Sequence, residues 1–249
     1  AEQGGGRLQR LARSVNIRER LDFSCAVFDP SGALVANAPH IPVHLGAMGA
    51  VVRDLMATTD PIPASSIWLS NDPMAGGSHL PDLTVVMPVD HDGERFWVAC
   101  RGHHVDVGGI TPGSMPPHST SLADEGLVFR HVRIDKRVAG LPLPGCRAPD
   151  TVRDDLRAQC ASVRFMAERL CKLGSAETLR DAMVWLADLS EQATADALLR
   201  LPSGTATDTI HDVPLRVTVS VTDARLHVDW TGTEGPHPGN LNAPTAIVR

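Results

Sequence analysis

The chain has 249 residues, a length typical of one large domain or two smaller ones. Hydrophobic residues make up 43% of it and charged residues 21%, which is ordinary for a globular protein and excludes an intrinsically disordered chain. The net charge is −6 and no long run of Lys or Arg is present, so nucleic acid is not expected as a partner. No apolar run approaches the roughly 18 residues of a membrane span, so no membrane is expected either. The 5 cysteines lack Cys-x-x-Cys spacing, which favours a reducing cytoplasm over a disulfide framework or zinc ribbon.

The first part of the chain predicts short strands separated by turns and long loops. A triple glycine at Gly4–Gly6 is expected to be a flexible lead-in, followed by a short helix over 8–14. Apolar runs with turn residues between them predict strands at 25–28, 33–35, 67–69, 83–89 and 96–100. The loops between them are long and rich in Gly, Pro and His, which is typical of functional loops; they cover 37–46, 71–82 and 102–118.

The periodicity changes after a Pro-rich connector at 140–149. Apolar residues then recur at helical spacing, which predicts two helices that we expect to pack against each other as a pair. From Ile210 the pattern alternates again and predicts a half-buried hairpin over 215–230. We therefore predict an α+β fold in three parts. These are a mixed, β-rich part with the long functional loops (1–149), a helical pair (150–203) and a β region that is incomplete at its C-terminal end (204–249).

One of the long loops offers a pair of metal-binding side chains. Gly76 and Gly77 allow unusual backbone dihedrals just before His79 and Asp82. An imidazole and a carboxylate at this spacing are competent ligands for Zn, Mn or Fe. A single pair of this kind more often stabilises a turn through side-chain hydrogen bonds, so it needs further support.

Further candidate ligands lie at two strand ends. His103 and His104 follow the strand at 96–100, and adjacent residues there point to opposite faces, so only one of them is expected to join His79 and Asp82. Asp22 precedes the strand at 25–28, although a salt bridge to the neighbouring arginines is the simpler interpretation of that residue. Two histidines and two carboxylates would suit a divalent metal that keeps open positions for water or substrate.

The loop over 108–120 is stiffened by glycines and prolines and could present backbone N–H groups to an oxyanion or phosphate. The chain has no Walker sequence, dinucleotide fingerprint or Gly-x-Ser-x-Gly motif. We therefore do not expect ATP to bind here in a P-loop.

Taken together, these segments resemble the hydantoinase B/oxoprolinase family, which includes the B subunit of ATP-dependent hydantoinases and the C-terminal half of 5-oxoprolinase. The matching stretches are 14–26, 39–48, 76–82, 101–104, 108–120 and 239–244. They follow the family's order over nearly the whole chain. Family members are longer, so the resemblance implies that this chain is a fragment or is truncated.

The resemblance implies the metal-dependent catalytic subunit of a cyclic amide hydrolase, opening rings of the hydantoin or 5-oxoproline type. A hydantoinase A-type ATPase partner in a hetero-oligomer would use ATP to phosphorylate the substrate. One divalent ion (Mn, Zn or Fe) would be bound. The implied ligands are Asp22, His79, Asp82 and His104, and it is the resemblance that selects His104 over His103.

The remaining candidates have supporting roles. His103, His118 and Glu125 are candidates for proton transfer or substrate contact, and His44 is a candidate for holding a metal ligand from behind. Two other functions stay open: a related ATP-dependent carboxylase subunit and a non-catalytic, truncated assembly module. ATP consumption with and without bicarbonate would separate the first of these from the hydrolase.

Overall fold

The computed structural model describes residues 1–38 and 41–248, and the chain divides into two compact units. Unit 1 comprises residues 1–180 together with the C-terminal segment that starts at Ala243, and unit 2 comprises Asp181–Asn242. Among the helices of the described residues, none combines the length and the apolar character needed to cross a membrane. The site of interest lies in unit 1.

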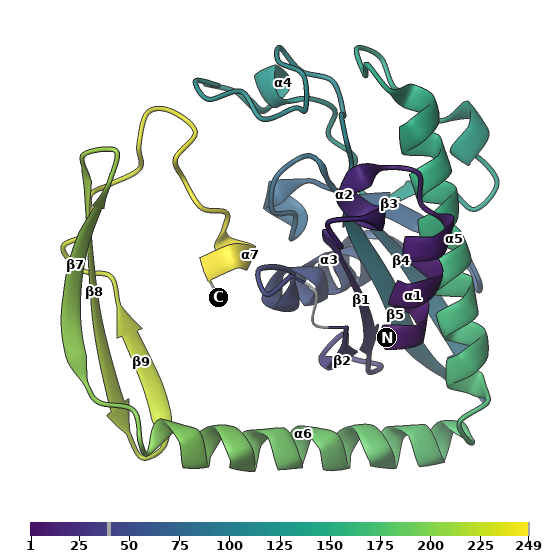
Figure 1. Ribbon diagram of the computed structural model, residues 1–249. Helices are drawn as coiled ribbons and strands as arrows, with labels where there is room; N and C mark the ends of the chain where they lie inside the picture. The colour runs from purple at the N-terminus through teal and green to yellow at the C-terminus, as the bar shows by residue number, and fades with distance from the viewer. Residues whose placement is uncertain (39–40, 249) are drawn as a thin grey trace. The chain divides into compact units, whose positions relative to one another are not determined.

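A six-stranded antiparallel sheet forms the centre of unit 1, with strand order β2-β1-β5-β4-β3-β6 (Figure 1). Its strands are β1 (Phe23–Phe28), β2 (Leu34–Asn37), β3 (Trp68–Ser70), β4 (Asp82–His91), β5 (Glu94–His103) and β6 (Val132–Arg133). The strands predicted from the apolar runs are confirmed, while the two-residue β6 carries too little pattern to be predicted. The α+β class is likewise confirmed.

The two longest strands, β4 and β5, form a hairpin whose turn is Asp92-Gly93. Both turn residues have positive φ, 48° and 84°, as a tight two-residue hairpin turn requires. This turn fixes the register, so Asp82 at the start of β4 lies directly opposite His103 at the end of β5.

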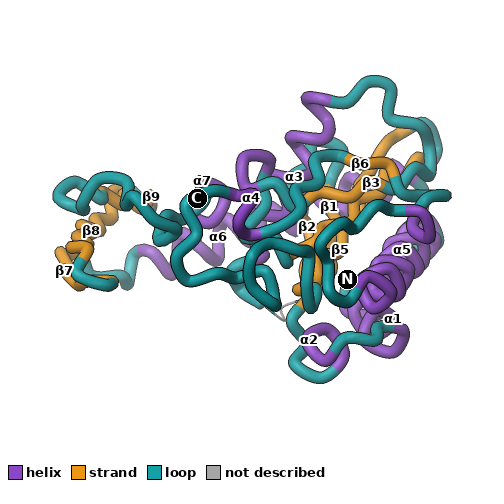
Figure 2. Tube along the Cα trace, turned by 90° about the horizontal axis from the view of Figure 1, so that it is seen from above, coloured by secondary structure: helices purple, strands orange, loops and turns teal. Residues whose placement is uncertain are grey.

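Helices cover both faces of the sheet (Figures 1 and 2). On one face, α3 (His44–Thr58) packs Met48, Val51 and Leu55 into the main apolar cluster, which includes Phe28 and Trp97 of the sheet. On the other face lie α1 (Glu2–Leu11) and α5 (Pro149–Cys171). The sheet is therefore buried on both sides, which explains the nearly continuous apolar run of β4.

The triple glycine belongs to α1, so the expectation of a flexible lead-in is wrong. Gly4 and Gly5 are buried, and a Cβ on Gly4 would lie 2.5 Å from Sδ of Met166 on α5. Glycine is needed here because it lets the two helices approach closely, rather than because the chain is mobile.

Short helical segments connect these elements. They are α2 (Val15–Arg18), η1 (Pro73–Ala75), α4 (Leu122–Glu125), η2 (Val138–Gly140) and α7 (Thr245–Val248). The last of these, α7, contacts α3 and η1 within unit 1.

Helix α5 buries its apolar face against β4, β5 and α1. The face that we expected to pack on the following helix is therefore covered by unit 1 itself, and the prediction of a packed helical pair is wrong for α5. Helix α6 (Ala176–Leu198) starts in unit 1 and continues into unit 2.

Unit 2 contains a three-stranded antiparallel sheet in the order β7-β8-β9. The strands are β7 (Gly204–Ile210), β8 (Val213–Thr222) and β9 (Arg225–Asp229). The hairpin of β8 and β9 is confirmed, and its turn at Asp223-Ala224 again has positive φ at both residues.

Candidate metal centre

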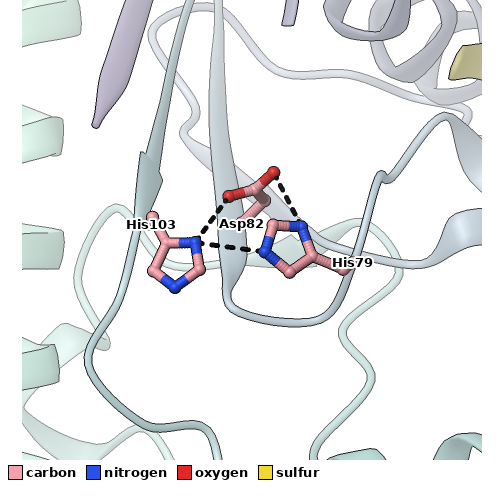
Figure 3. Close-up of side chains that lie close together, drawn as sticks. All are labelled: His79, Asp82 and His103. Atoms are coloured by element: carbon pink, nitrogen blue, oxygen red, sulfur yellow. Dashed lines mark hydrogen bonds and ion pairs between the residues drawn. The ribbon is translucent and has the colours of Figure 1, made fainter. Parts of the chain in front are cut away.

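Three metal-binding side chains converge at the open end of the β4–β5 hairpin: His79, Asp82 and His103 (Figure 3). His79 Nε2 lies 3.1 Å from His103 Nδ1, and His79 Nδ1 lies 3.1 Å from Asp82 Oδ2. His103 Nδ1 lies 3.4 Å from Asp82 Oδ1. One nitrogen or oxygen from each residue falls within 4.8 Å of the others, so a single cation could contact all three.

Asp82 is the most enclosed member of this cluster, with a side chain only 1% exposed. His44, the first residue of α3, places its Nε2 3.4 Å from Asp82 Oδ2 and its Nδ1 3.0 Å from Ser24 Oγ, and Ser78 donates a hydrogen bond to Asp82. Burial raises the pKa of Asp82, but the hydrogen bonds from His103, His44 and His79 lower it by more, so the carboxyl remains ionised. His44 thus lies behind Asp82, in the position expected of a supporting residue.

His79 is held by the loop between β3 and β4. Gly76 takes a φ of 90° and packs so closely on α3 that a Cβ would lie 2.4 Å from the backbone N of Val51. Asn71 ties the same loop together, because its Nδ2 donates to the Leu80 carbonyl at 2.8 Å. The glycines therefore give the loop its close approach to α3, which brings His79 and Asp82 to the sheet edge.

Arg101 lies beneath the cluster on the same face of β5 as His103, and its side chain is fully buried. Its Nε donates to Thr84 Oγ1 at 2.8 Å and its Nη2 donates to the Gly76 carbonyl at 2.8 Å. Burial lowers the pKa of Arg101 to about 10, and the charge of Asp82 opposes this effect. The guanidinium therefore stays charged at neutral pH and anchors the loop that carries His79.

The charge of the cluster also affects His79, the most exposed of the three side chains. Burial lowers the pKa of His79, but its hydrogen bond to Asp82 and the charge of that carboxylate raise it by more, so the net pKa is raised. A proton and a metal cation would therefore compete for the imidazole.

Asp22 stands at the edge of the cluster. Its Oδ2 lies 3.7 Å from His103 Nδ1, and its carbonyl accepts a hydrogen bond from the His103 backbone N–H. Within the described residues it makes no ion pair with Arg18 or Arg20, the partners that the simpler interpretation assigned to it. Asp22 is thus placed to become a fourth ligand.

His104 lies apart from the cluster, in contrast to the selection that the resemblance favours. Its side chain is fully buried on the α5 side of the sheet, where its Nε2 lies 2.9 Å from Gln159 Oε1. Burial lowers the pKa of His104. The argument that adjacent residues point to opposite faces is correct, and the residue on the Asp82 side is His103.

The other candidates lie outside the group that converges on Asp82. His118 is exposed, and Glu125 in α4 accepts a hydrogen bond from Ser119 Oγ at 2.7 Å. Their roles in proton transfer or substrate contact remain predictions. Pro39 and His40, part of another segment that carries the resemblance, lie outside the described residues.

The donor set fits a divalent metal ion. Two imidazoles and one carboxylate are typical ligands for Zn, Mn and Fe, and three protein ligands leave positions free for water or substrate. Asp82 Oδ1 is buried and has no hydrogen-bond partner among the described residues, which is the environment in which a cation would satisfy it.

Comparison with known proteins gives a consistent assignment. The model of the hydantoinase B/oxoprolinase family matches residues 1–249. The 5-oxoprolinase of Dictyostelium discoideum is 40% identical over 100% of this chain and 21% of its own length. The chain thus spans about a fifth of the first 5-oxoprolinases that it matches.

Two solved structures share the fold. The crystal structure of the ATP-dependent caprolactamase from Pseudomonas jessenii superimposes with a TM-score of 0.88 at 24% identity, covering 98% of this chain and 46% of that one. Nucleotide-free acetone carboxylase superimposes with a TM-score of 0.80 at 16% identity, covering 93% and 35%. At these identities the likeness shows the fold alone.

Proposed function

Because the chain belongs to the hydantoinase B/oxoprolinase family, we propose that it is the metal-holding part of an ATP-driven cyclic amide hydrolase. The substrate class would be rings of the hydantoin or 5-oxoproline type. The observation that carries the proposal is the convergence of His79, Asp82 and His103 at the open end of one hairpin. The 40% identity to a 5-oxoprolinase supports the choice of substrate class.

His79, Asp82 and His103 would hold the cation, with Asp22 as the nearest further ligand. A divalent ion there supplies Lewis-acid chemistry for opening an amide ring. The protein's own contribution is to keep Asp82 ionised, through the contacts of His44 and Ser78, and to fix His79 through the loop that Arg101 anchors. This set replaces His104 by His103 in the ligand assignment.

ATP would be used by a partner rather than by this chain. A hydantoinase A-type ATPase, as a separate subunit in a hetero-oligomer or as another part of a longer protein, would phosphorylate the ring carbonyl oxygen and turn it into a better leaving group. The caprolactamase that shares this fold is described as ATP-dependent, which supports the division of labour.

A carboxylase subunit is the second candidate, because acetone carboxylase has the same fold. The two functions differ in what the assembled enzyme consumes. ATP hydrolysis that depends on 5-oxoproline and proceeds without bicarbonate supports the hydrolase, whereas a requirement for bicarbonate supports the carboxylase. A non-catalytic assembly module would bind no metal and hydrolyse no ring.

The metal centre is tested by titrating Mn²⁺ and Zn²⁺ into the complete protein and its variants, with calorimetry as the readout. We expect one ion per chain, and we expect His103→Asn to weaken binding by more than roughly 100-fold, since losing a ligand should exceed the loss of a supporting contact. The matched control is His131→Asn, because His131 Nε2 also contacts a carboxylate, Asp54 Oδ2 at 2.6 Å, outside the cluster. Equal loss of binding in both variants, or no binding by the unmodified protein, contradicts the proposal.

A further inference from the structure

One buried amide, that of Gln159, bridges the two strands that carry the metal cluster, and it does so from the opposite face of the sheet. Gln159 lies on α5 and its side chain is fully buried. Its Nε2 donates hydrogen bonds to the carbonyl of Leu83 on β4 at 2.9 Å and to the carbonyl of Cys100 on β5 at 3.1 Å. A single side chain therefore joins both arms of the hairpin.

The same amide holds the end of β5. Because both Nε2 protons are directed at carbonyl oxygens, Gln159 Oε1 can only accept, and His104 Nε2, 2.9 Å away, must be the donor. Leu83 and His104 each adjoin a residue of the cluster, Asp82 and His103 respectively. The amide thus holds each strand one residue away from a ligand.

The sheet is built to admit this contact. Gly102, between Arg101 and His103, leaves open the space that a side chain would fill on the α5 side. A Cβ there would lie 2.9 Å from Cδ1 of Ile17 and 3.6 Å from Nε2 of Gln159. Without a side chain at 102, the amide and Ile17 both pack directly on the strand backbone.

We propose that Gln159 is a positioning residue for the metal centre, acting through Leu83 and His104 to hold Asp82 opposite His103. This inference rests on the proposed metal-dependent function. Side chains that orient metal ligands from behind typically change metal affinity by roughly 10- to 100-fold, and Gln159 would do so across the thickness of the sheet.

The experiment measures Mn²⁺ affinity by calorimetry, together with the unfolding temperature, in the complete protein. Gln159→Met keeps the volume and removes all three hydrogen bonds, and Gln159→Asn keeps an amide that is one methylene too short to reach. Both are made because the loss of a buried amide in either could prevent folding. The control is Ser162→Ala on the same buried face of α5, where Ser162 Oγ donates to the Gly4 carbonyl at 2.9 Å and contacts neither β4 nor β5 through its hydrogen bond.

We expect the Gln159 variants to bind Mn²⁺ at least roughly tenfold more weakly than the unmodified protein, and Ser162→Ala to bind within about twofold of it, even where the unfolding temperatures fall together. Unchanged affinity in a folded Gln159 variant overturns the positioning role and leaves the metal centre standing. A loss of affinity that simply follows the unfolding temperature in all three variants overturns it as well. If the unmodified protein binds no ion, the proposed function fails first and the positioning role with it.

Discussion

Replacing the buried guanidinium beneath the cluster should change stability far less than its hydrogen bonds suggest. Arg101→Met keeps a long side chain of similar shape and removes the charge. The lost hydrogen bonds, to Thr84 Oγ1 and the Gly76 carbonyl, are worth about 0.5–1.5 kcal/mol each. Their combined loss would destabilise the protein by about 1–3 kcal/mol.

The removal of the charge acts in the opposite direction. The pKa of Arg101 is about 10 in the folded protein against an ordinary 12.5, and at 1.36 kcal/mol per pKa unit this means that burying the charge costs about 3 kcal/mol. The two effects nearly cancel, so we expect Arg101→Met to change the free energy of unfolding at pH 7 by less than about 2 kcal/mol. Removing one member of a well-paired buried ion pair typically costs about 3–5 kcal/mol instead.

Urea unfolding of the metal-free protein measures this difference directly. Arg101→Ala is the companion variant, because it removes the same charge but leaves a cavity, and it should be the less stable of the two by about 2 kcal/mol or more. A loss above about 4 kcal/mol in Arg101→Met would refute the reasoning, since it would show that the buried charge is stabilised far better than its lowered pKa indicates.

Two further predictions concern acid stability and backbone geometry. Burial raises the pKa of Asp106, but hydrogen bonds from Arg147 and from backbone N–H groups lower it by more, so the net pKa is lowered. Protons therefore bind the unfolded chain first, and the stability that Asp106 contributes is present above about pH 4 and is lost as the pH falls further; Asp106→Asn should flatten this dependence in urea unfolding measured from pH 5 to pH 3. Gly76→Ala and Gly93→Ala both place alanine at positive φ, but only at Gly76 would the Cβ meet backbone, 2.4 Å from Val51 N. Gly93→Ala should cost about 1–2 kcal/mol and Gly76→Ala clearly more, and equal losses would show that the close approach to α3 is not limiting.

The strands of unit 1 could be predicted because each is either alternately or continuously apolar between turn residues. The pattern did not reveal what each helix packs against. Helix α5 and the following helix both carry apolar stripes, and a stripe alone does not distinguish a sheet from a helix as its partner. The same limit explains the triple glycine, since close packing of α1 on Met166 is a tertiary requirement that leaves no local signal.

The candidate site was predictable to within one residue. His79, Asp82 and Asp22 were named from the sequence, and the choice between His103 and His104 was left to the resemblance. The sequence does contain a signal that settles their order, the Asp92-Gly93 turn. A two-residue turn places positions equidistant from it opposite one another, and His103 is the position opposite Asp82. His104 is then directed to the other face by the period of the strand.

The return of the chain to α3 has a consequence for biosynthesis. Helix α7 joins unit 1 only after the whole of unit 2 has been passed, and it contacts α3 and η1. On a translating ribosome, the first 180 residues can therefore emerge and begin to pack while this flank of α3, whose first residue is His44, still lacks its final neighbour. Completion of the half that carries the histidines must wait for the residues made last.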